Sequence, residues 1–241
     1  RPVMLSGLQN VSLLITQPHA CSYLEQRTAR NLVVDPRLRL DAARYEQLLE
    51  QGFRRSGDAV YRPHCPQCQA CTPVRIPVRD FAPDRAQRRC MKRNRDLQLV
   101  RVSTINSDIL ALYERYLRAR HEGEGMEADD HFGFERFTDC SWMPVEYWQY
   151  FHDDRLVACA VVDVLPHGFS AVYTVFDPAP DHAARSLGTL AVLSQISAAQ
   201  SEGRDHVWLG YWIPGCSKME YKKRFRPQER SDGAGWSRIA E

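Results

Sequence analysis

The sequence predicts an α+β protein in which a smaller, cysteine-bearing N-terminal domain precedes a larger domain of strands and helices. Two observations predict this class. Three strand-like runs, an apolar helix and a further strand follow one another between residues 146 and 213, and a cysteine-rich segment lies between two extended pieces in the first half. The 241 residues suffice for one large or two modest domains. We place the domain boundary between 1–105 and 106–241.

The first predicted helix covers residues 41–51. Asp41 can cap it, Tyr45, Leu48 and Leu49 share one face, and Gly52 supplies a stop. Residues 53–78 then predict a small ribbon-like module, because a Gly-Asp turn and two extended pieces surround a tight cysteine-rich loop. From residue 84 to residue 95, basic side chains recur at helical spacing.

The second half opens with a predicted helix at 107–121, and an acidic, glycine-bearing segment at 122–130 predicts a mobile loop. Residues 146–151, 155–165 and 169–176 predict three successive antiparallel strands. A helix at 186–200 and a strand at 206–213 follow. This is the element order of the N-acetyltransferase-like (GNAT) α+β fold.

Folds of this kind often bind an acyl donor's pyrophosphate with a glycine-rich turn at the start of the helix. Residues 185–190 nearly match that pattern, but Leu190 places a large side chain where the pyrophosphate needs a close approach to the backbone. The sequence therefore disfavours an acyl-CoA donor. The helix start can still hold another anionic or carbonyl group.

Charge is distributed unevenly along the chain. Residues 1–105 hold 18 Lys and Arg against 9 Asp and Glu, whereas residues 106–241 hold 14 against 21. The total of +2 therefore conceals a basic first half and an acidic second half. Such an asymmetry favours a nucleic acid or another anionic partner.

No apolar run in the sequence approaches the roughly 18 residues that a membrane span requires. The first residues are also not typical of a signal peptide. We therefore expect a cytoplasmic protein with no membrane partner.

The cysteines are candidates for metal ligands. Cys65, Cys68 and Cys71 lie at C-x-x-C-x-x-C spacing, and Cys21 could complete a set of four soft ligands for zinc or an iron–sulfur cluster. His19 or His64 could replace one thiol. The alternative is a group of free, redox-sensitive thiols.

Several long segments resemble one known family. They are HACSYL at 19–24, FRRSGDAVYRPHCPQCQACTPVRI at 53–76, YTVFDP at 173–178, SLGT at 186–189 and WLGYWIPGCSKMEYKKRFRP at 208–227. Together they resemble the aminoacyl-tRNA–protein transferases, and most closely the bacterial aspartate/glutamate leucyltransferase branch. The resemblance implies that an amino acid moves from charged tRNA to the N-terminal amine of proteins beginning with Asp or Glu, which marks these proteins for N-degron degradation.

The donor in such a reaction is an activated ester and the nucleophile is an α-amine, so no covalent enzyme intermediate is needed. We expect positioning to dominate over acid–base chemistry. Asp177 ends a predicted strand and is a candidate to steer the amine proton, although Asp before Pro is also a common turn former. Tyr173 is a candidate to stabilise an oxyanion or hold the terminal adenosine, although a strand tyrosine can simply be packed.

The remaining candidates bind the substrates. A surface or capping role is the alternative for each of them. Donor-binding residues implied by the resemblance are Ser186, Leu187, Gly188, Thr189, Gly210, Tyr211, Lys218, Tyr221 and Lys222. Candidates for the acceptor's acidic side chain are Arg54, Arg55 and Arg75, because arginine forks pair bidentately with carboxylates. Candidates for the tRNA backbone are Arg85, Arg88, Arg89, Lys92 and Arg93.

Leucine as the donated amino acid rests on the likeness to the bacterial branch, and arginine is the alternative. A non-catalytic tRNA-binding zinc module is a second alternative. An acyl-CoA acetyltransferase is a third, which Leu190 disfavours.

Overall fold

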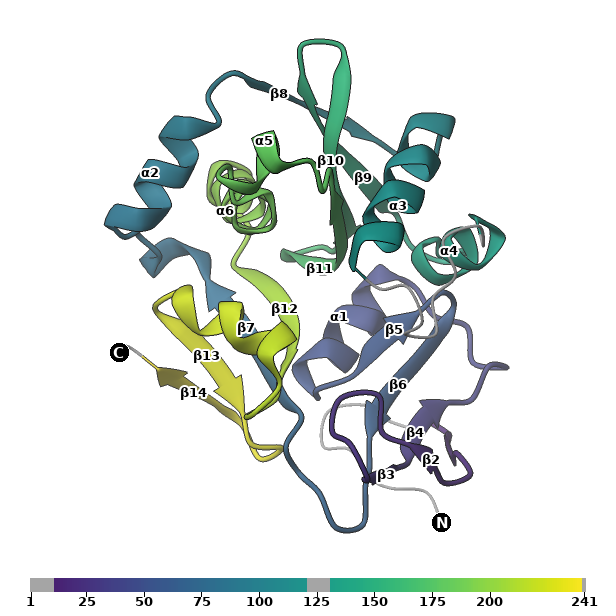
Figure 1. The fold of residues 1–241 in the computed structure, drawn as a ribbon. Coiled ribbons are helices and arrows are strands. Elements are labelled where there is room, and N and C mark those ends of the chain that lie inside the picture. Colours follow the sequence, from purple (N-terminus) through teal and green to yellow (C-terminus); the bar gives the residue numbers. More distant parts are fainter. Residues whose placement is uncertain (1–10, 121–130, 240–241) are drawn as a thin grey trace.

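The structure, a computed structural model, describes residues 11–120 and 131–239. Its largest part is an eight-stranded sheet in the order β14-β13-β7-β12-β11-β10-β9-β8 (Figure 1). In chain order these strands are β7 (Thr72–Pro77), β8 (Leu97–Val102), β9 (Val145–His152), β10 (Arg155–Val164), β11 (Gly168–Phe176), β12 (His206–Trp212), β13 (Gln228–Ser231) and β14 (Trp236–Ile239).

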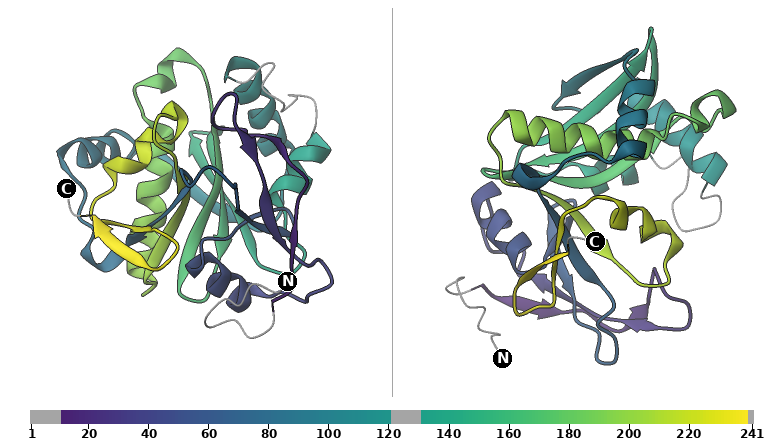
Figure 2. Two further views of the ribbon diagram at one scale, coloured as in Figure 1. Left: turned by 90° about the horizontal axis from the view of Figure 1, so that it is seen from below. Right: turned by 90° about the vertical axis from the view of Figure 1, so that its left-hand side faces the viewer.

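A smaller sheet and a short strand pair form the N-terminal part. The smaller sheet has the order β1-β4-β6-β5, and β2 pairs with β3. These strands are β1 (Leu13–Ile15), β2 (His19–Ala20), β3 (Thr28–Ala29), β4 (Asn31–Val34), β5 (Arg54–Ser56) and β6 (Ala59–Pro63). In Figure 1 and in the right view of Figure 2, this sheet lies below the layers formed by α3 (Ser107–Arg120) and α6 (Leu187–Ser201).

The other helices connect and cover the sheets. They are α1 (Ala42–Glu50), η1 (Val78–Asp80), α2 (Arg85–Arg93), α4 (His131–Thr138), α5 (Pro180–Ala183) and η2 (Ser217–Arg224). Figure 1 shows α2 and α6 on one side of the large sheet and α3 and α4 on the other. None of the helices in the described ranges has the length and apolar character needed to cross a membrane.

The central strands are buried on both faces. Along β10, Cys159 and Val161 belong to the apolar core that contains α1 and α3, whereas Ala158 and Ala160 belong to the core that contains α6. This alternation follows from the two-residue period of a strand. Residues 156–162 of β10 are therefore apolar without interruption, because helices cover both faces of this part of the strand.

The structure confirms most of the predicted elements. The helices expected at 41–51, 107–121 and 186–200 appear as α1, α3 and α6. The three successive strands appear as β9, β10 and β11, which pair antiparallel as predicted. The loop predicted at 122–130 lies outside the described residues. The fold is thus a mixed α/β arrangement built on a large sheet.

The ribbon-like module predicted at 53–78 is wrong in one respect. The strands on either side of the cysteine loop, β6 and β7, belong to different sheets, because β6 pairs with β4 and β5 while β7 lies between β12 and β13. Val74 and Ile76 of β7 are fully buried in the α6 core, which explains why this strand joins the large sheet. The domain boundary after residue 105 stays a prediction.

Candidate active site

The candidate site is an opening in the large sheet where two parallel strands separate. β11 and β12 pair only along Gly168–Ser170 and His206–Trp208, although β11 continues to Phe176 and β12 to Trp212. Each of the two strands also has one extra residue near this point. Val172 interrupts the pairing of β11 with β10, and Leu209 interrupts the pairing of β12 with β7. The separated strand ends carry Tyr173, Gly210 and Tyr211, three of the residues predicted from the sequence.

Arg54 reaches into the opening from β5. Its Nη1 donates to Ser170 Oγ and its Nη2 donates to the Ala171 carbonyl, both at 2.7 Å. The guanidinium thus contacts β11 at the residue where its pairing with β12 ends. Because the contacts use only part of the five-donor fork, Arg54 can still donate to a group bound in the opening.

Gly210 lines the same opening from the β12 side. Its φ of +81° is one that residues with a Cβ rarely adopt, and a Cβ there would lie 3.4 Å from Arg54 Nη2. The backbone conformation therefore favours glycine, and the Arg54 guanidinium packs directly against the Gly210 backbone. This places Gly210, predicted as a donor-binding residue, directly beside a candidate acceptor-binding arginine.

Lys222 of η2 is buried beside the end of β12. Its Nζ donates to the Tyr211 carbonyl at 2.6 Å and to Met219 Sδ at 3.1 Å. The opposite residue on β7 is Pro73, which has no N–H to offer a strand carbonyl. Burial, reinforced by the Arg54 guanidinium, lowers the pKa of Lys222 to about 7. No carboxylate in residues 11–120 or 131–239 pairs with this amine, so a substantial fraction is neutral near pH 7.

Tyr211 and Tyr221 flank Lys222. The Tyr211 hydroxyl donates to the Gly52 carbonyl at 2.7 Å, which ties β12 to the N-terminal part. Tyr221 is 39% exposed, and partial burial raises its pKa to about 12. Lys218, at the start of η2, is exposed.

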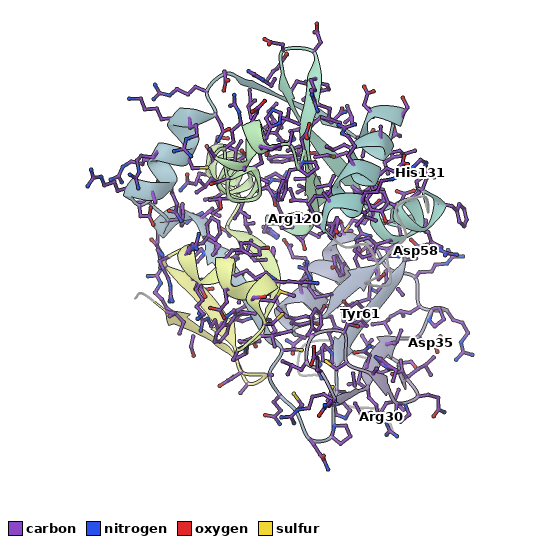
Figure 3. All side chains as sticks on the ribbon, in the orientation of Figure 1. Arg30, Asp35, Asp58, Tyr61, Arg120 and His131 are labelled. Carbon is purple, nitrogen blue, oxygen red and sulfur yellow. The ribbon has the colours of Figure 1, made fainter. Side chains whose placement is uncertain are left out.

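Aromatic side chains form the other wall of the opening. The Tyr173 ring meets the rings of Tyr116 and Phe137 edge-on, at centroid distances of 6.3 and 5.9 Å, and burial raises the pKa of Tyr173. The Arg120 guanidinium lies 4.6 Å from the centre of the Phe176 ring. Figure 3 labels Arg120 near the centre of the view. Sequence reasoning missed Arg120, although its spacing of four residues from Tyr116 on a predicted helix could have indicated its contact with the Tyr116 ring, whose centre lies 5.7 Å from the guanidinium.

The start of α6 lies next to Phe176. Ser186 has a left-handed conformation with φ of 53°, and its side chain makes no capping hydrogen bond. Leu187 is buried, and a Cβ at Gly188 would lie 3.7 Å from the Phe176 ring. Thr189 is half-buried and Leu190 is in the core. The structure thus brings the predicted donor-binding turn beside the aromatic wall.

Asp177 lies beyond the end of β11 and is almost fully buried. Its carboxylate accepts from the Ala179 amide at 3.0 Å and from Arg155 Nη2 at 2.6 Å. Burial by itself would raise the pKa of Asp177, but these hydrogen bonds outweigh it and the net pKa lies below the ordinary value. A carboxylate held in this way is a weak proton acceptor, and the contacts are those of a turn-forming residue.

Arg55 and Arg75, unlike Arg54, already hold carboxylates. All five N–H groups of Arg55 are engaged, by the buried Asp163 carboxylate and by carbonyls at Gly57, Thr138 and Asp139. Burial disfavours its charge, but Asp163 more than offsets that effect and the pKa of Arg55 is raised.

Arg75 bonds to two glutamates. Its guanidinium contacts Glu50 and Glu229 and stacks on the Trp236 ring at 4.3 Å. Acceptor binding by Arg55 and Arg75 stays a prediction, but the structure gives both side chains other partners.

The predicted tRNA-binding residues form an exposed row on α2. Arg85, Arg88, Arg89, Lys92 and Arg93 are all exposed, while Gln87, Cys90 and Asn94 face the protein. A capping box between Asp84 and Gln87 fixes the start of this helix. The basic row is therefore displayed on a well-anchored surface.

The cysteine segment lines a large cavity. Cys21, Cys65, Cys68 and Cys71 all border it, and burial together with the neighbouring thiols raises the pKa of Cys71 to about 12. Within the described residues, no three histidine, cysteine, aspartate or glutamate side chains converge in a way that could hold a metal ion. The zinc or iron–sulfur site stays a prediction.

Two family models match the chain. One described as arginine-tRNA-protein transferase, N terminus, matches residues 19–89, and one described as arginine-tRNA-protein transferase, C terminus, matches residues 108–232. The predicted domain boundary falls between the two matches.

Curated relatives named aspartate/glutamate leucyltransferase match nearly the whole chain. The protein of that name from Stenotrophomonas maltophilia (strain K279a) is 52% identical over 93% of this chain and 91% of its own length. The Halorhodospira halophila protein is 46% identical over 94% and 96%, and the Aeromonas salmonicida protein is 44% identical over 93% and 94%. Among solved structures, L-PGS from Bacillus licheniformis is similar with a TM-score of 0.45 and 10% identity, over 66% of this chain and 57% of that chain.

Proposed function

Because the chain belongs to the arginine-tRNA-protein transferase family, we propose that it transfers leucine from leucyl-tRNA to the N-terminal α-amine of proteins beginning with Asp or Glu. The observation that carries this proposal is the 44–52% identity to proteins named aspartate/glutamate leucyltransferase over more than nine tenths of the chain. The new N-terminal leucine would mark the acceptor for N-degron degradation in the cytoplasm.

The reaction exchanges an ester for an amide. The α-amine nitrogen attacks the ester carbonyl carbon, a C–N bond forms, and the bond from that carbon to the tRNA 3′ oxygen breaks. One proton leaves the nitrogen and one proton reaches the 3′ oxygen. The ester is already activated, so the protein has to orient the two substrates and manage this proton.

The buried amine of Lys222 is our candidate for the proton acceptor. Its pKa of about 7 makes it partly neutral at the pH at which the acceptor amine, with a pKa of about 7.7–8.0, must lose its charge. Its two hydrogen-bond partners use N–H groups and leave the nitrogen lone pair to accept a proton. Arg54, which lies in the opening, could orient the developing oxyanion or the acceptor. Asp177 remains the sequence-based alternative for the proton.

The donor would enter at the start of α6, where Phe176 and Arg120 offer an aromatic and a guanidinium face to the terminal adenosine. We propose that β9–β12 and α6 form a GNAT-like domain that uses this helix start for an aminoacyl ester. The exposed row on α2 would contact the tRNA backbone.

A transfer assay tests the function. The protein is mixed with tRNA charged with labelled leucine and with peptides that begin with Asp, Glu, Arg or Ala. We expect label on the Asp and Glu peptides alone, and a parallel mixture with arginyl-tRNA tests arginine as the alternative donor. Binding of tRNA with no transfer would instead identify a non-catalytic tRNA-binding module.

The cysteines need a separate test, and no step proposed above passes through a metal. If the four thiols do hold zinc or an iron–sulfur cluster, elemental analysis of protein purified without oxygen will find the metal at stoichiometric amounts. Alanine substitution at Cys65 and Cys68 should then remove it. Protein that contains neither zinc nor iron would contradict the prediction.

A further inference from the structure

A cavity of about 900 Å³ adjoins the candidate site on its N-terminal side. Residues of the N-terminal strands and the cysteine segment line it together with the ends of β12 and β13. Tyr211 borders it, and the carbonyl of the same residue holds Lys222. The cavity and the opening between β11 and β12 are therefore neighbours.

The cavity wall is strongly basic. Arg27, Arg30, Arg62 and Arg230 line it, and none of the four has a carboxylate partner in the part of the chain that the structure describes. Among the described residues, the wall contains a single acidic one, Asp232, whose carboxylate accepts from the Ala234 and Gly235 amides of its own turn. Arginines elsewhere, such as those at 55, 75 and 185, are paired with Asp or Glu.

Two of the four arginines are held in fixed positions. Arg62 lies over the Phe53 ring at 4.9 Å and donates one N–H group to the Gln51 carbonyl. Arg230 stacks on the Trp212 ring at 4.1 Å and donates its Nε–H to Gln228 Oε1. Each side chain is thus ordered by one ring and one hydrogen bond, and most of its donors have no protein acceptor among the described residues. Such preorganised forks suit a carboxylate.

We propose that this cavity binds the acidic side chain of the acceptor's N-terminal residue, and that Arg62 and Arg230 are its carboxylate-binding residues. This proposal rests on the proposed function and assigns its acceptor specificity to residues other than Arg55 and Arg75. The acceptor's α-amine would then lie toward Tyr211 and Lys222, where the ester carbonyl is attacked.

The composition of the wall favours a peptide over tRNA as the occupant. The cavity also has apolar wall residues, Leu24 and Ile213 among them, that suit the side chains following the first acidic residue.

Peptide binding without tRNA tests the proposal independently of catalysis. Peptides beginning with Asp or with its neutral isostere Asn carry a fluorophore at the C-terminus, and their affinity is measured by fluorescence anisotropy. We expect the protein to prefer the Asp peptide. Arg62→Met and Arg230→Met should each weaken Asp-peptide binding about ten- to a hundredfold, because a charge-assisted pair is removed, and leave Asn-peptide binding unchanged.

The matched control is Arg79→Met, since Arg79 is 80% exposed and pairs with Asp205 outside the cavity. Arg62→Lys keeps the charge without the fork and should bind with intermediate affinity. Thermal denaturation shows whether each variant folds, and Arg30→Met replaces any variant that does not.

Equal binding of Asp and Asn peptides by the unaltered protein would overturn the proposal. So would variants that lose leucyl-tRNA binding and keep their peptide affinity, because the cavity would then belong to the tRNA. Failure of leucine transfer with intact Asp-peptide selectivity would refute the proposed function alone.

Discussion

Burial and pairing give the basic side chains around the opening different chemical properties. Arg55 is enclosed by one carboxylate and three carbonyls, and all of its donors are used. Lys222 is equally enclosed but has only a carbonyl and a thioether as partners. The first therefore remains charged and structural, whereas the second can gain and lose a proton near neutral pH. This difference leads to two predictions about single residues.

The rate of leucine transfer should rise with pH through about pH 7, because Lys222 accepts a proton only when it is neutral and its pKa is about 7. Lys222→Met should lower the rate about a hundredfold and leave only the ionisation of the acceptor amine, at about pH 7.7–8.0. Single-turnover transfer measured across pH tests this. Lys223→Met is the control, since Lys223 lies on the same turn and pairs with Glu220. An identical pH profile in Lys222→Met and unaltered protein would rule out the proton-transfer role.

Arg55→Met should destabilise the protein by about 3–5 kcal/mol, because it leaves the Asp163 carboxylate buried without its partner. Replacing both residues, as Arg55→Met with Asp163→Leu, should restore much of the stability, since no charge then stays buried. Urea denaturation measures both effects. A single variant within about 1 kcal/mol of the unaltered protein would show that the pair is not needed for folding.

The α2 helix separates two functions on its two sides. Gln87 and Cys90 contact the protein at the Arg224 carbonyl and at the carbonyls that precede α6, while the basic residues point outward. A helix anchored at this place can present charge to tRNA without changing the opening. Removal of charge from its outer side should therefore change tRNA affinity and leave acceptor binding intact.

Arg88→Gln combined with Arg89→Gln should weaken leucyl-tRNA binding and reduce its salt dependence. For every tRNA phosphate that no longer has a basic partner, the slope of log K against log salt becomes shallower by about 0.7–0.9. Filter binding at several salt concentrations measures this slope, with Arg44→Gln on α1 as an exposed control. An unchanged slope in the double variant would mean that the tRNA binds elsewhere.

Local sequence patterns predicted individual elements and the pairing of consecutive strands, but they did not predict the pairing of β7 with distant strands. The apolar residues at 107–121 and 186–200 were sufficient to predict α3 and α6. One face of α3 is buried, and most of α6 is buried. By contrast, the partners of β7 lie more than a hundred residues away, in β12 and β13, and no local pattern carries that information. Arg54 was found as a candidate because its residue type and neighbours are visible in the sequence. Whether Arg62 and Arg230 have carboxylate partners depends on residues far away in the chain, and no local pattern indicates it.

At the scale of the whole molecule, β7 joins the two predicted domains. It follows the cysteine segment in sequence but lies inside the large sheet, between β12 and β13. A chain restricted to 106–241 would lack this strand and β8, and its β13–β14 pair would lose its connection to the rest of the sheet. The two predicted domains are therefore expected to depend on each other for folding.

We expect residues 106–241 expressed alone to lack a cooperative unfolding transition, and co-expression with residues 1–105 to restore one. Circular dichroism during thermal denaturation compares the two preparations. A cooperative transition in the isolated 106–241 chain would show instead that the boundary at residue 105 separates independent folding units.

The position of β7 also affects how the protein forms during synthesis. β7 leaves the ribosome long before β12 and β13, so the large sheet closes only when nearly the whole chain has been made. Pairing over such long separations is slow, because the chain gives up the entropy of the open loop before the strands begin to stabilise each other. Until then β7 presents unpaired N–H and C=O groups, which can pair with other chains. We therefore expect the nascent protein to depend on chaperones more than its modest length suggests.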